Sequence, residues 1–240
     1  MRIWTITVGE PVPGFSGTSR QWRCGALSQL LAERGHDVTW WTSSVDHFTK
    51  TQMVTSSAVH VVSGKLRIQF LHGPTYTRNV SVVRYWNHRV IAREFVRLAG
   101  GEALPDLLLC SFPTIELSAA AVAFGRRHGV PVFLDIRDLW PDEILARVPR
   151  WMRGAGRLVL APLFREAARA LQGATGIVGI SEAYLGWALD RAQRPRTTSD
   201  RVFPLGYTGQ LHRAEPGPEV GARLLAMGVD PASATSTSER

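Results

Sequence analysis

Short apolar runs and longer segments of helical spacing alternate along most of the sequence. The first part predicts a strand over 2–8, a loop rich in glycine and proline over 9–19, a helix that Ser19 caps and Gly35 ends, and a strand over 37–41. A strand, a loop, a helix and a second strand in this order make a βαβ unit.

The same alternation continues beyond this unit. The further strands are expected over 59–62, 66–71, 106–111, 174–181 and 201–205, with another from residue 132. The further helices are expected over 83–98, 119–128 and from Ser181 through Leu189. The segment 147–171 is expected to form one or two helices, with Pro162 as a break or a helix start. The polar segment 43–57 has no period and predicts a surface loop that could cover a ligand. We therefore predict an α/β fold, a Rossmann-like parallel sheet with helices on both faces.

The 240 residues suffice for one large domain or two small ones. After Gly206 the pattern changes to a linker rich in proline and glycine, a short helix pattern over 220–227 and a polar tail. We expect a Rossmann-like domain over 1–208 and a linker with the start of another domain over 209–240. No long apolar run or leader pattern occurs, so we expect a cytoplasmic protein.

The net charge of +8 comes almost entirely from arginine, since Lys50 and Lys65 are the only lysines. This balance favours an anionic partner, such as nucleotide phosphates or lipid headgroups. No basic run with interleaved aromatics occurs, so a nucleic-acid partner is not expected. Cys24 and Cys110 lie in apolar patterns and predict free thiols, and no histidines have the spacing of metal ligands.

The stretch from Val132 to Ile144, VFLDIRDLWPDEI, joins a buried strand pattern to a sudden run of charge. Its charged side chains are Asp135, Arg137, Asp138, Asp142 and Glu143. Charge at the carboxyl end of a buried strand is typical of the ligand crevice of an α/β sheet. Two interpretations stay open: these residues bind a ligand, or Arg137 pairs with Asp135 or Asp142 and holds the loop together.

The first loop offers groups that suit a phosphate or a sugar. Gly14 and Gly17 would let backbone N–H groups come close, Ser16 and Thr18 supply hydroxyl groups, and the start of the next helix favours an anion. A plain flexible turn is the alternative. The sequence contains no G-x-G-x-x-G fingerprint, no Walker pattern and no G-x-S-x-G elbow.

Strand ends of such a sheet converge on one crevice, so we expect the 14–18 loop to meet the 132–144 stretch there. Arginine offers a planar fork to phosphate or carboxylate, and aspartate can hold sugar hydroxyls or act as a base. Ser181 and Glu182 open onto the same edge, although Ser181 also fits a helix N-cap without a ligand.

The segment from Arg147 to Arg169 mixes arginine with large apolar residues at helical spacing. This pattern is typical of a basic amphipathic segment that lies on an anionic membrane. The alternative is a solvated arginine face over an ordinary core.

The order of these motifs resembles the amino-terminal half of the family 4 glycosyltransferases, bacterial enzymes of the GT-B fold that build capsules, O-antigens and other exopolysaccharides. The resemblance covers about residues 1–210. It is carried by the opening residues 1–43, DIRDLWPDE (135–143), GIVGISEAYLGWAL (176–189) and VFPLGY (202–207).

The resemblance implies a retaining transfer without a cofactor, from a nucleotide-sugar donor to a glycan or lipid-linked acceptor. This half mainly binds the acceptor, and a second Rossmann-like half binds the donor. The resemblance places the loop from Gly14 to Thr18 near the donor phosphates. Arg137 and Asp138 fall where many relatives carry a His-Asp pair. Arginine stands here in place of the histidine, so the role of that histidine in positioning the sugar is not carried over. Asp135, with Ser181 and Glu182, is expected in the acceptor cleft.

The glycine-rich loop and spaced glutamates of the family's donor half do not occur in this sequence. We therefore expect negligible transferase activity from the chain alone, either as a truncated product or as one subunit of a split enzyme with a separate donor chain. The alternative is a non-catalytic module that holds an acceptor at the membrane. In a complete enzyme, Arg137→Ala is expected to leave folding nearly intact and abolish transfer.

Overall fold

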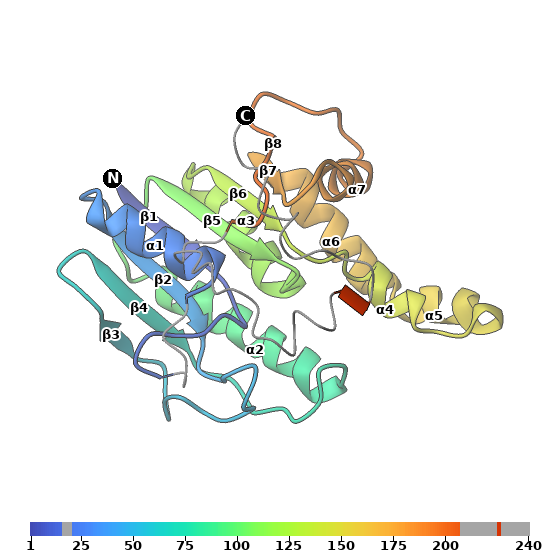
Figure 1. Ribbon diagram of the computed structural model, residues 1–240, viewed down its shortest axis with the longest axis horizontal. Helices are drawn as coiled ribbons and strands as arrows, with labels where there is room; N and C mark the ends of the chain where they lie inside the picture. The colour runs from blue at the N-terminus through green and yellow to red at the C-terminus, as the bar shows by residue number, and fades with distance from the viewer. Residues whose placement is uncertain (16–20, 207–224, 227–240) are drawn as a thin grey trace. The chain divides into compact units, whose positions relative to one another are not determined.

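The computed structural model describes residues 1–15, 21–206 and 225–226 (Figure 1). The chain divides into two compact units, Met1–Gly206 and Tyr207–Arg240. The first unit holds all the elements that follow. In the second, only the helical residues 225–226 are described, so the predicted boundary after residue 208 and most of the predicted helix over 220–227 lie outside the described residues.

Within the described residues, eight strands form one sheet in the order β3-β4-β2-β1-β5-β6-β7-β8. The strands are β1 (Arg2–Ile6), β2 (Asp37–Ser43), β3 (Val59–Val61), β4 (Leu66–Leu71), β5 (Leu107–Phe112), β6 (Val132–Ile136), β7 (Gly176–Gly179) and β8 (Arg201–Val202). All neighbours pair in parallel except β3, which forms an antiparallel hairpin with β4. The predicted parallel sheet is confirmed, with one antiparallel strand at its edge.

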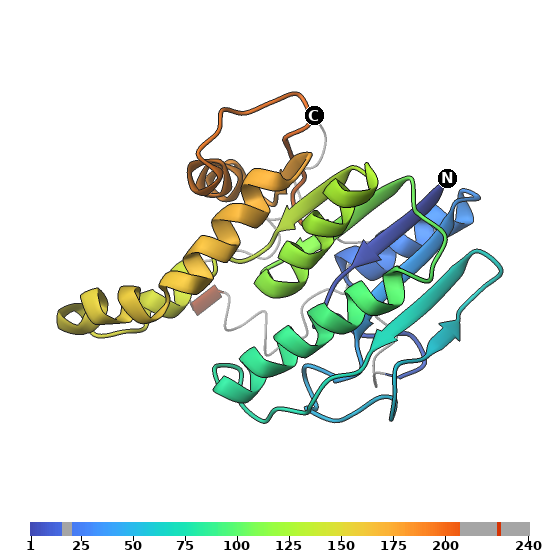
Figure 2. The same ribbon diagram turned by 180° about the vertical axis from the view of Figure 1, so that it is seen from behind.

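Helices cover both faces of this sheet, as predicted. They are α1 (Arg23–Glu33), α2 (Val82–Ala99), α3 (Ile115–His128), α4 (Asp142–Ala146), the 3-10 turn η1 (Arg150–Met152), α5 (Arg153–Val159), α6 (Ala161–Gly173) and α7 (Glu182–Ala192). Figures 1 and 2 show α1 on one face, and α2, α3 and α6 side by side on the other.

Two adjacent tryptophans of β2 show how the core is divided. Successive residues of a strand point to opposite faces, and both Trp40 and Trp41 are fully buried. Trp41 lies 4.9 Å from Trp4 and 5.1 Å from Phe95 of α2, measured between ring centroids. Trp40 belongs to a smaller apolar cluster with Phe70 on the face that α1 covers. The sheet is therefore buried on both faces, as its apolar strands predict.

Local signals set several element ends correctly. Gly35, with φ of +88°, follows α1 and donates its N–H to the carbonyl of Ala32. Ser181 caps α7 by accepting the N–H of Tyr184 at 3.4 Å. The predicted start of α1 is wrong, because the helix begins at Arg23 rather than after Ser19, and Ser19 lies outside the described residues.

Two other predictions need correction and one is confirmed. The segment 43–57 is not wholly exposed, since its first four residues are buried and Val45 forms a bridge with Gln52. The segment 147–171 forms the two helices α5 and α6 after the turn η1, and Pro162 lies in the first turn of α6, so the predicted helix start at this proline is confirmed. The strand predicted over 201–205 has only two residues. Among the described helices, none is long and apolar enough to cross a membrane.

We expect Gly125→Ala to destabilise the fold, because α3 lies close to the start of β6 at this glycine. An added methyl group would overlap the side chain of Val132 and lie 2.6 Å from the carbonyl oxygen of Val130. Overpacking of this kind costs about 1–3 kcal/mol in the free energy of unfolding, measured by denaturant titration. Gly186→Ala is the control, because α7 leaves open space there, and it should stabilise by about 0.5–1 kcal/mol. Equal effects of the two variants would contradict the close α3–β6 packing.

Candidate functional site

The carboxyl ends of β1, β2 and β4 to β7 lie at one edge of the sheet, because these strands are parallel. Of the predicted loop, Gly14 is described, whereas Ser16, Gly17 and Thr18 lie outside the described residues. Gly14 has φ of +78° and has open space where a side chain would begin. A side chain at this position would strain the turn, which explains a glycine there.

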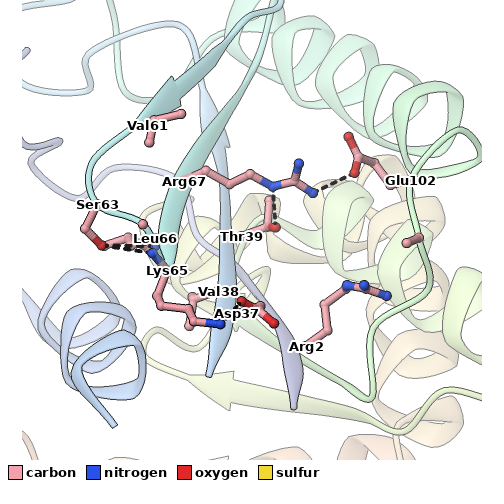
Figure 3. Close-up of a pocket in the computed structure, with 12 residues that line it drawn as sticks. Arg2, Asp37, Val38, Thr39, Val61, Ser63, Lys65, Leu66, Arg67 and Glu102 are labelled. Atoms are coloured by element: carbon pink, nitrogen blue, oxygen red, sulfur yellow. Dashed lines mark hydrogen bonds and ion pairs between the residues drawn. The ribbon is translucent and has the colours of Figure 1, made fainter. Parts of the chain in front are cut away.

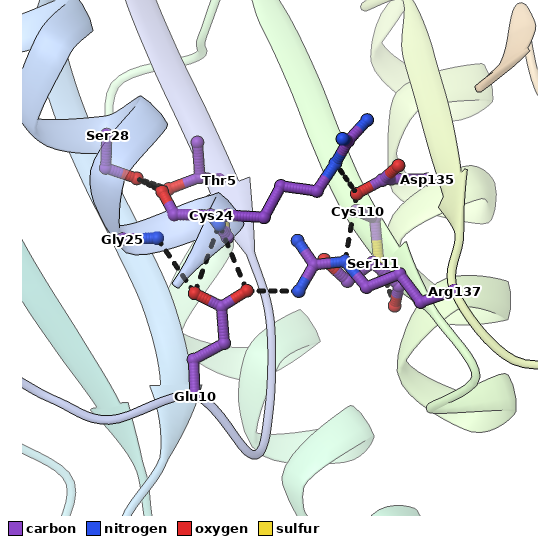
Figure 4. A network of polar contacts seen from close by, with 10 residues as sticks. Thr5, Glu10, Cys24, Gly25, Ser28, Cys110, Ser111, Asp135 and Arg137 are labelled. Atoms are coloured by element: carbon purple, nitrogen blue, oxygen red, sulfur yellow. Dashed lines mark hydrogen bonds and ion pairs between the residues drawn. The ribbon is translucent and has the colours of Figure 1, made fainter. Parts of the chain in front are cut away.

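Asp135 is the buried centre of a charge network at this edge (Figure 4). Its Oδ2 atom accepts hydrogen bonds from the Nε atoms of Arg23 at 3.0 Å and Arg137 at 2.9 Å. The residue is only 2% exposed, and its Oδ1 atom has no hydrogen-bond partner among the described residues. Asp135 is thus buried and held in ion pairs with Arg23 and Arg137. Its contact with an acceptor stays a prediction.

Glu10 completes the network from the loop after β1. Its carboxylate forms an ion pair with Arg137 and accepts the backbone N–H groups of Cys24 at 3.0 Å and Gly25 at 2.9 Å. These N–H groups belong to the first turn of α1, where a helix favours negative charge. The anion predicted at this helix start is therefore the carboxylate of Glu10, a side chain of the protein itself. The sequence patterns gave no sign of this role of Glu10.

Opposite charges decide the protonation of this buried network. Burial alone would lower the pKa of Arg137, but the carboxylates of Glu10 and Asp135 outweigh it and raise that pKa. Burial, followed by the charge of Glu10, raises the pKa of the Cys24 thiol, and burial raises the pKa of Cys110 to about 12. Both thiols are therefore neutral at pH 7 and unsuited to nucleophilic chemistry.

The structure chooses between the two pairing partners considered for Arg137. Asp142 pairs instead with Arg191 and accepts the indole N–H of Trp187 at 3.1 Å. These contacts attach the first turn of α4 to α7. The pairing of Arg137 with Asp135 is thus confirmed, whereas a pairing with Asp142 is wrong.

Asp138 is the exposed carboxylate of the same loop. Within residues 1–15 and 21–206 it forms no ion pair with a basic side chain. Although the residue is exposed, partial burial of the carboxylate and then the nearby Glu143 raise its pKa, while Arg137 and Arg84 act in the opposite direction. An exposed carboxylate without an ion-pair partner is chemically suited to accept hydrogen bonds from the hydroxyl groups of a sugar.

Comparisons with known proteins relate this fold to sugar-transferring enzymes. No protein-family model matches the sequence, and no curated protein matches it. Sucrose-phosphate synthase from Thermosynechococcus elongatus superposes with a TM-score of 0.52 at 15% identity, over 95% of this chain and 96% of that one. Starch synthase IV from Arabidopsis thaliana, bound to ADP and acarbose, gives a TM-score of 0.50 at 9% identity, over 85% of this chain and 51% of that one.

The chain has the fold of a GT-B glycosyltransferase half. The predicted Rossmann-like fold class is thereby confirmed. The chain spans about half the length of the starch synthase IV structure. At these identities the likeness concerns the fold, and the chemistry of the site has to be argued from its residues.

Ser181 and Glu182 follow β7 at the edge where the GT-B fold places strand-end loops, but they lie outside the Glu10–Asp135 network. The Ser181 hydroxyl is used as the cap of α7. Glu182 forms an exposed ion pair with Arg196 at 2.9 Å. Both therefore have structural partners, and their predicted place in an acceptor cleft stays a prediction.

A cavity lies at the opposite end of the sheet, where the strands begin (Figure 3). It has a volume of about 420 Å³. Four of its charged side chains pair with one another: Arg67 with Glu102 at 2.6 Å, and Lys65 with Asp37 at 2.8 Å, while the Arg2 guanidinium donates to the carbonyl of Leu104 at 3.0 Å. Because these charges are compensated and lie far from the strand-end loops, we place the candidate site at the carboxyl edge.

The described residues contain no group of three or more histidine, cysteine, aspartate or glutamate side chains that could hold a metal ion.

The contacts of Arg137 change the expectation for its replacement. Arg137→Ala would leave Glu10 and Asp135 buried without this cation, and removal of one partner from a buried ion pair typically costs about 3–5 kcal/mol. We therefore expect a large fall in the free energy of unfolding, measured by denaturant titration. Arg196→Ala is the control, because its ion pair is exposed and should contribute less than about 1 kcal/mol. Nearly intact stability in Arg137→Ala would favour the original view of Arg137 as a residue reserved for the substrate.

Proposed function

We propose that this chain is the acceptor-binding half of a retaining glycosyltransferase similar to family 4. It would transfer a sugar from a nucleotide-sugar donor to a glycan or lipid-linked acceptor in the synthesis of a surface polysaccharide. The observation that carries this proposal is the GT-B fold together with the charged side chains gathered at its carboxyl edge. The solved starch synthase IV carries ADP and acarbose, a nucleotide and a glycan, which supports a nucleotide-sugar donor.

Met1–Gly206 form one Rossmann-like unit, and the chain spans about half of the starch synthase IV structure. We therefore propose that the donor site belongs to a second unit, either in the same protein or in a separate chain. Transfer needs both reactants held in line, since positioning and electrostatic preorganisation supply much of the rate. Asp138 is the residue of this half that we assign to the reacting sugar.

The role of Asp138 can be tested in the gene product that carries this chain. Asp138→Asn keeps the size of the side chain but removes its charge, so we expect sugar transfer to fall by about 100-fold or more. The measurement is transfer of radiolabelled sugar from UDP-, GDP- and ADP-sugars to lipid and glycan fractions. Because the side chain is exposed, the free energy of unfolding should change by less than about 0.5 kcal/mol.

Glu143→Gln is the control, because it removes a neighbouring negative charge of the same loop. Full transfer by Asp138→Asn would contradict the role of Asp138. Absence of transfer with every donor by the unaltered gene product would contradict the proposed function itself.

We also propose that the protein acts at the inner face of the plasma membrane, through α5 and η1. Within these elements no residue is buried, and Trp151, Leu158 and Val159 are 84%, 78% and 77% exposed. Over α6 the alternative of arginines over an ordinary core fits better, because Ala167 is buried and Leu163 packs against the core. Exposed large apolar side chains beside arginines suit the surface of an anionic membrane, where the former enter the interface and the latter meet the headgroups.

Co-sedimentation with vesicles tests this membrane proposal. We expect binding to vesicles that contain phosphatidylglycerol, but little binding to neutral phosphatidylcholine vesicles or in 1 M salt. Replacing Arg150, Arg153 and Arg157 with alanine should weaken binding about 100-fold, since each basic residue contributes about 1 kcal/mol near such a surface.

The matched control replaces three exposed arginines elsewhere, Arg34, Arg126 and Arg127, with the same change in net charge. An equal loss of binding in both triple variants would indicate attraction by net charge alone and contradict a specific surface on α5.

A further inference from the structure

Three side chains, His47, Lys50 and Arg84, gather around Tyr76 at the carboxyl edge of the sheet, and we call these four residues the Tyr76 cluster. Tyr76 is only 2% exposed, and its hydroxyl lies 2.9 Å from the Nδ1 atom of His47. The Lys50 Nζ atom lies 5.3 Å and the Arg84 Cζ atom 5.6 Å from the centre of the Tyr76 ring. Two cations therefore share one aromatic ring.

The positive charge of this cluster lacks a carboxylate partner. Within residues 1–15 and 21–206, neither Lys50 nor Arg84 forms an ion pair, unlike Arg23 and Arg137 of the neighbouring network. Lys50 donates to the side-chain oxygen of Asn79, and Arg84 donates to the backbone carbonyl of Asn79. The buried Nε atom of Arg84 has no hydrogen-bond partner among these residues. The hydrogen bonds that exist are thus to neutral oxygens, and the carboxylates of Asp46 and Asp138 act on these two cations only from beyond ion-pair distance.

Mutual repulsion within the cluster agrees with this geometry. Burial, then the charges of Arg84 and Lys50, lowers the pKa of His47 to about 4. Burial and the charge of Arg84 also lower the pKa of Lys50. A bound anion would relieve this repulsion, because opposite charge within a few ångströms favours the charged form of each basic group.

Arg84 also reaches the loop that carries Asp138. Its Cζ atom lies 5.1 Å from the centre of the Trp140 ring, so the guanidinium lies between Tyr76 and the loop after β6. Asp138 is near enough to favour the charged form of Arg84. An anion at Arg84 would therefore lie beside the carboxylate that we assign to the sugar.

We propose that Lys50 and Arg84 bind a phosphate group of the acceptor, beside the sugar site at Asp138. A phosphate monoester carries nearly two negative charges and several acceptor oxygens, which matches a planar guanidinium fork and a lysine ammonium group. The proposal rests on the proposed function, whose acceptor it describes more closely.

Phosphate binding by the chain tests this proposal directly. We would titrate the protein with inorganic phosphate and with glucose 1-phosphate and follow binding by phosphorus NMR. Arg84→Gln and Lys50→Gln should each raise the dissociation constant of glucose 1-phosphate at least about tenfold. Arg93→Gln is the matched control, because Arg93 lies on the same helix over the ring of Trp86, and binding should change less than twofold.

Lys50→Gln and Arg84→Lys keep the test decisive if Arg84→Gln fails to fold. Arg84→Lys retains the charge but loses the fork, so an intermediate loss of affinity is expected. An unchanged dissociation constant in these variants, or an equal loss in Arg93→Gln, would overturn the proposal.

The phosphate could belong to a sugar phosphate or to a lipid carrier, and two experimental arms distinguish them. Binding of glucose 1-phosphate in solution that depends on Arg84 supports a sugar phosphate. Binding that depends on Arg84 only with neutral vesicles containing a polyprenyl phosphate supports a lipid-linked acceptor. Binding in neither arm overturns the proposal.

Failure of this inference can be told apart from failure of the proposed function. If the gene product transfers sugar to neutral acceptors and Lys50→Gln leaves the KM for every acceptor unchanged, the phosphate site is wrong and the function stands. If phosphate binding depends on Arg84 but no sugar is transferred, the phosphate site stands and the function is wrong.

Discussion

Pairing of buried charge at the carboxyl edge is the constraint on which the rest of this structure depends. Charged groups removed from water are costly unless they meet opposite charge and hydrogen bonds, so Glu10, Asp135, Arg23 and Arg137 each require the others. The four residues come from the loop after β1, the start of α1, β6 and the loop after β6. This pairing fixes where the strand-end loops lie, and therefore the geometry of the candidate site.

The same pairing decides which basic groups remain for a ligand. The start of α1 would ordinarily attract a phosphate, but the carboxylate of Glu10 already accepts its N–H groups. Arg23 and Arg137 are likewise held by carboxylates. Positive charge without such a partner is found one loop away, at Lys50 and Arg84 around Tyr76. In our proposal the phosphate of the acceptor therefore binds near the start of α2 rather than at the N–H groups of α1.

The sequence predicts those features that depend on neighbouring residues. Apolar runs located the central strands, Gly35 marked the end of α1, and Ser181 marked the start of α7. The start of α1 was misplaced because the carboxylate that meets its first turn, Glu10, lies 14 residues before Cys24 and leaves no local signal. The Tyr76 cluster was missed for the same reason, since its members come from two separate loops and a helix that only the folded sheet brings together.

The position of α5 connects the two proposals about the acceptor. The loop that carries Asp138 runs directly into α4, which Asp142 attaches to α7, and the chain then passes through η1 into α5. A membrane bound at α5 would therefore lie at the end of residues 1–206 to which the 137–141 loop leads, where Figure 1 shows α4 and α5 projecting from the sheet. A lipid carrier could then keep its apolar tail in the bilayer while its phosphate approached Arg84. An acceptor of this kind needs both an apolar membrane surface, as on α5, and nearby cations, as at Lys50 and Arg84.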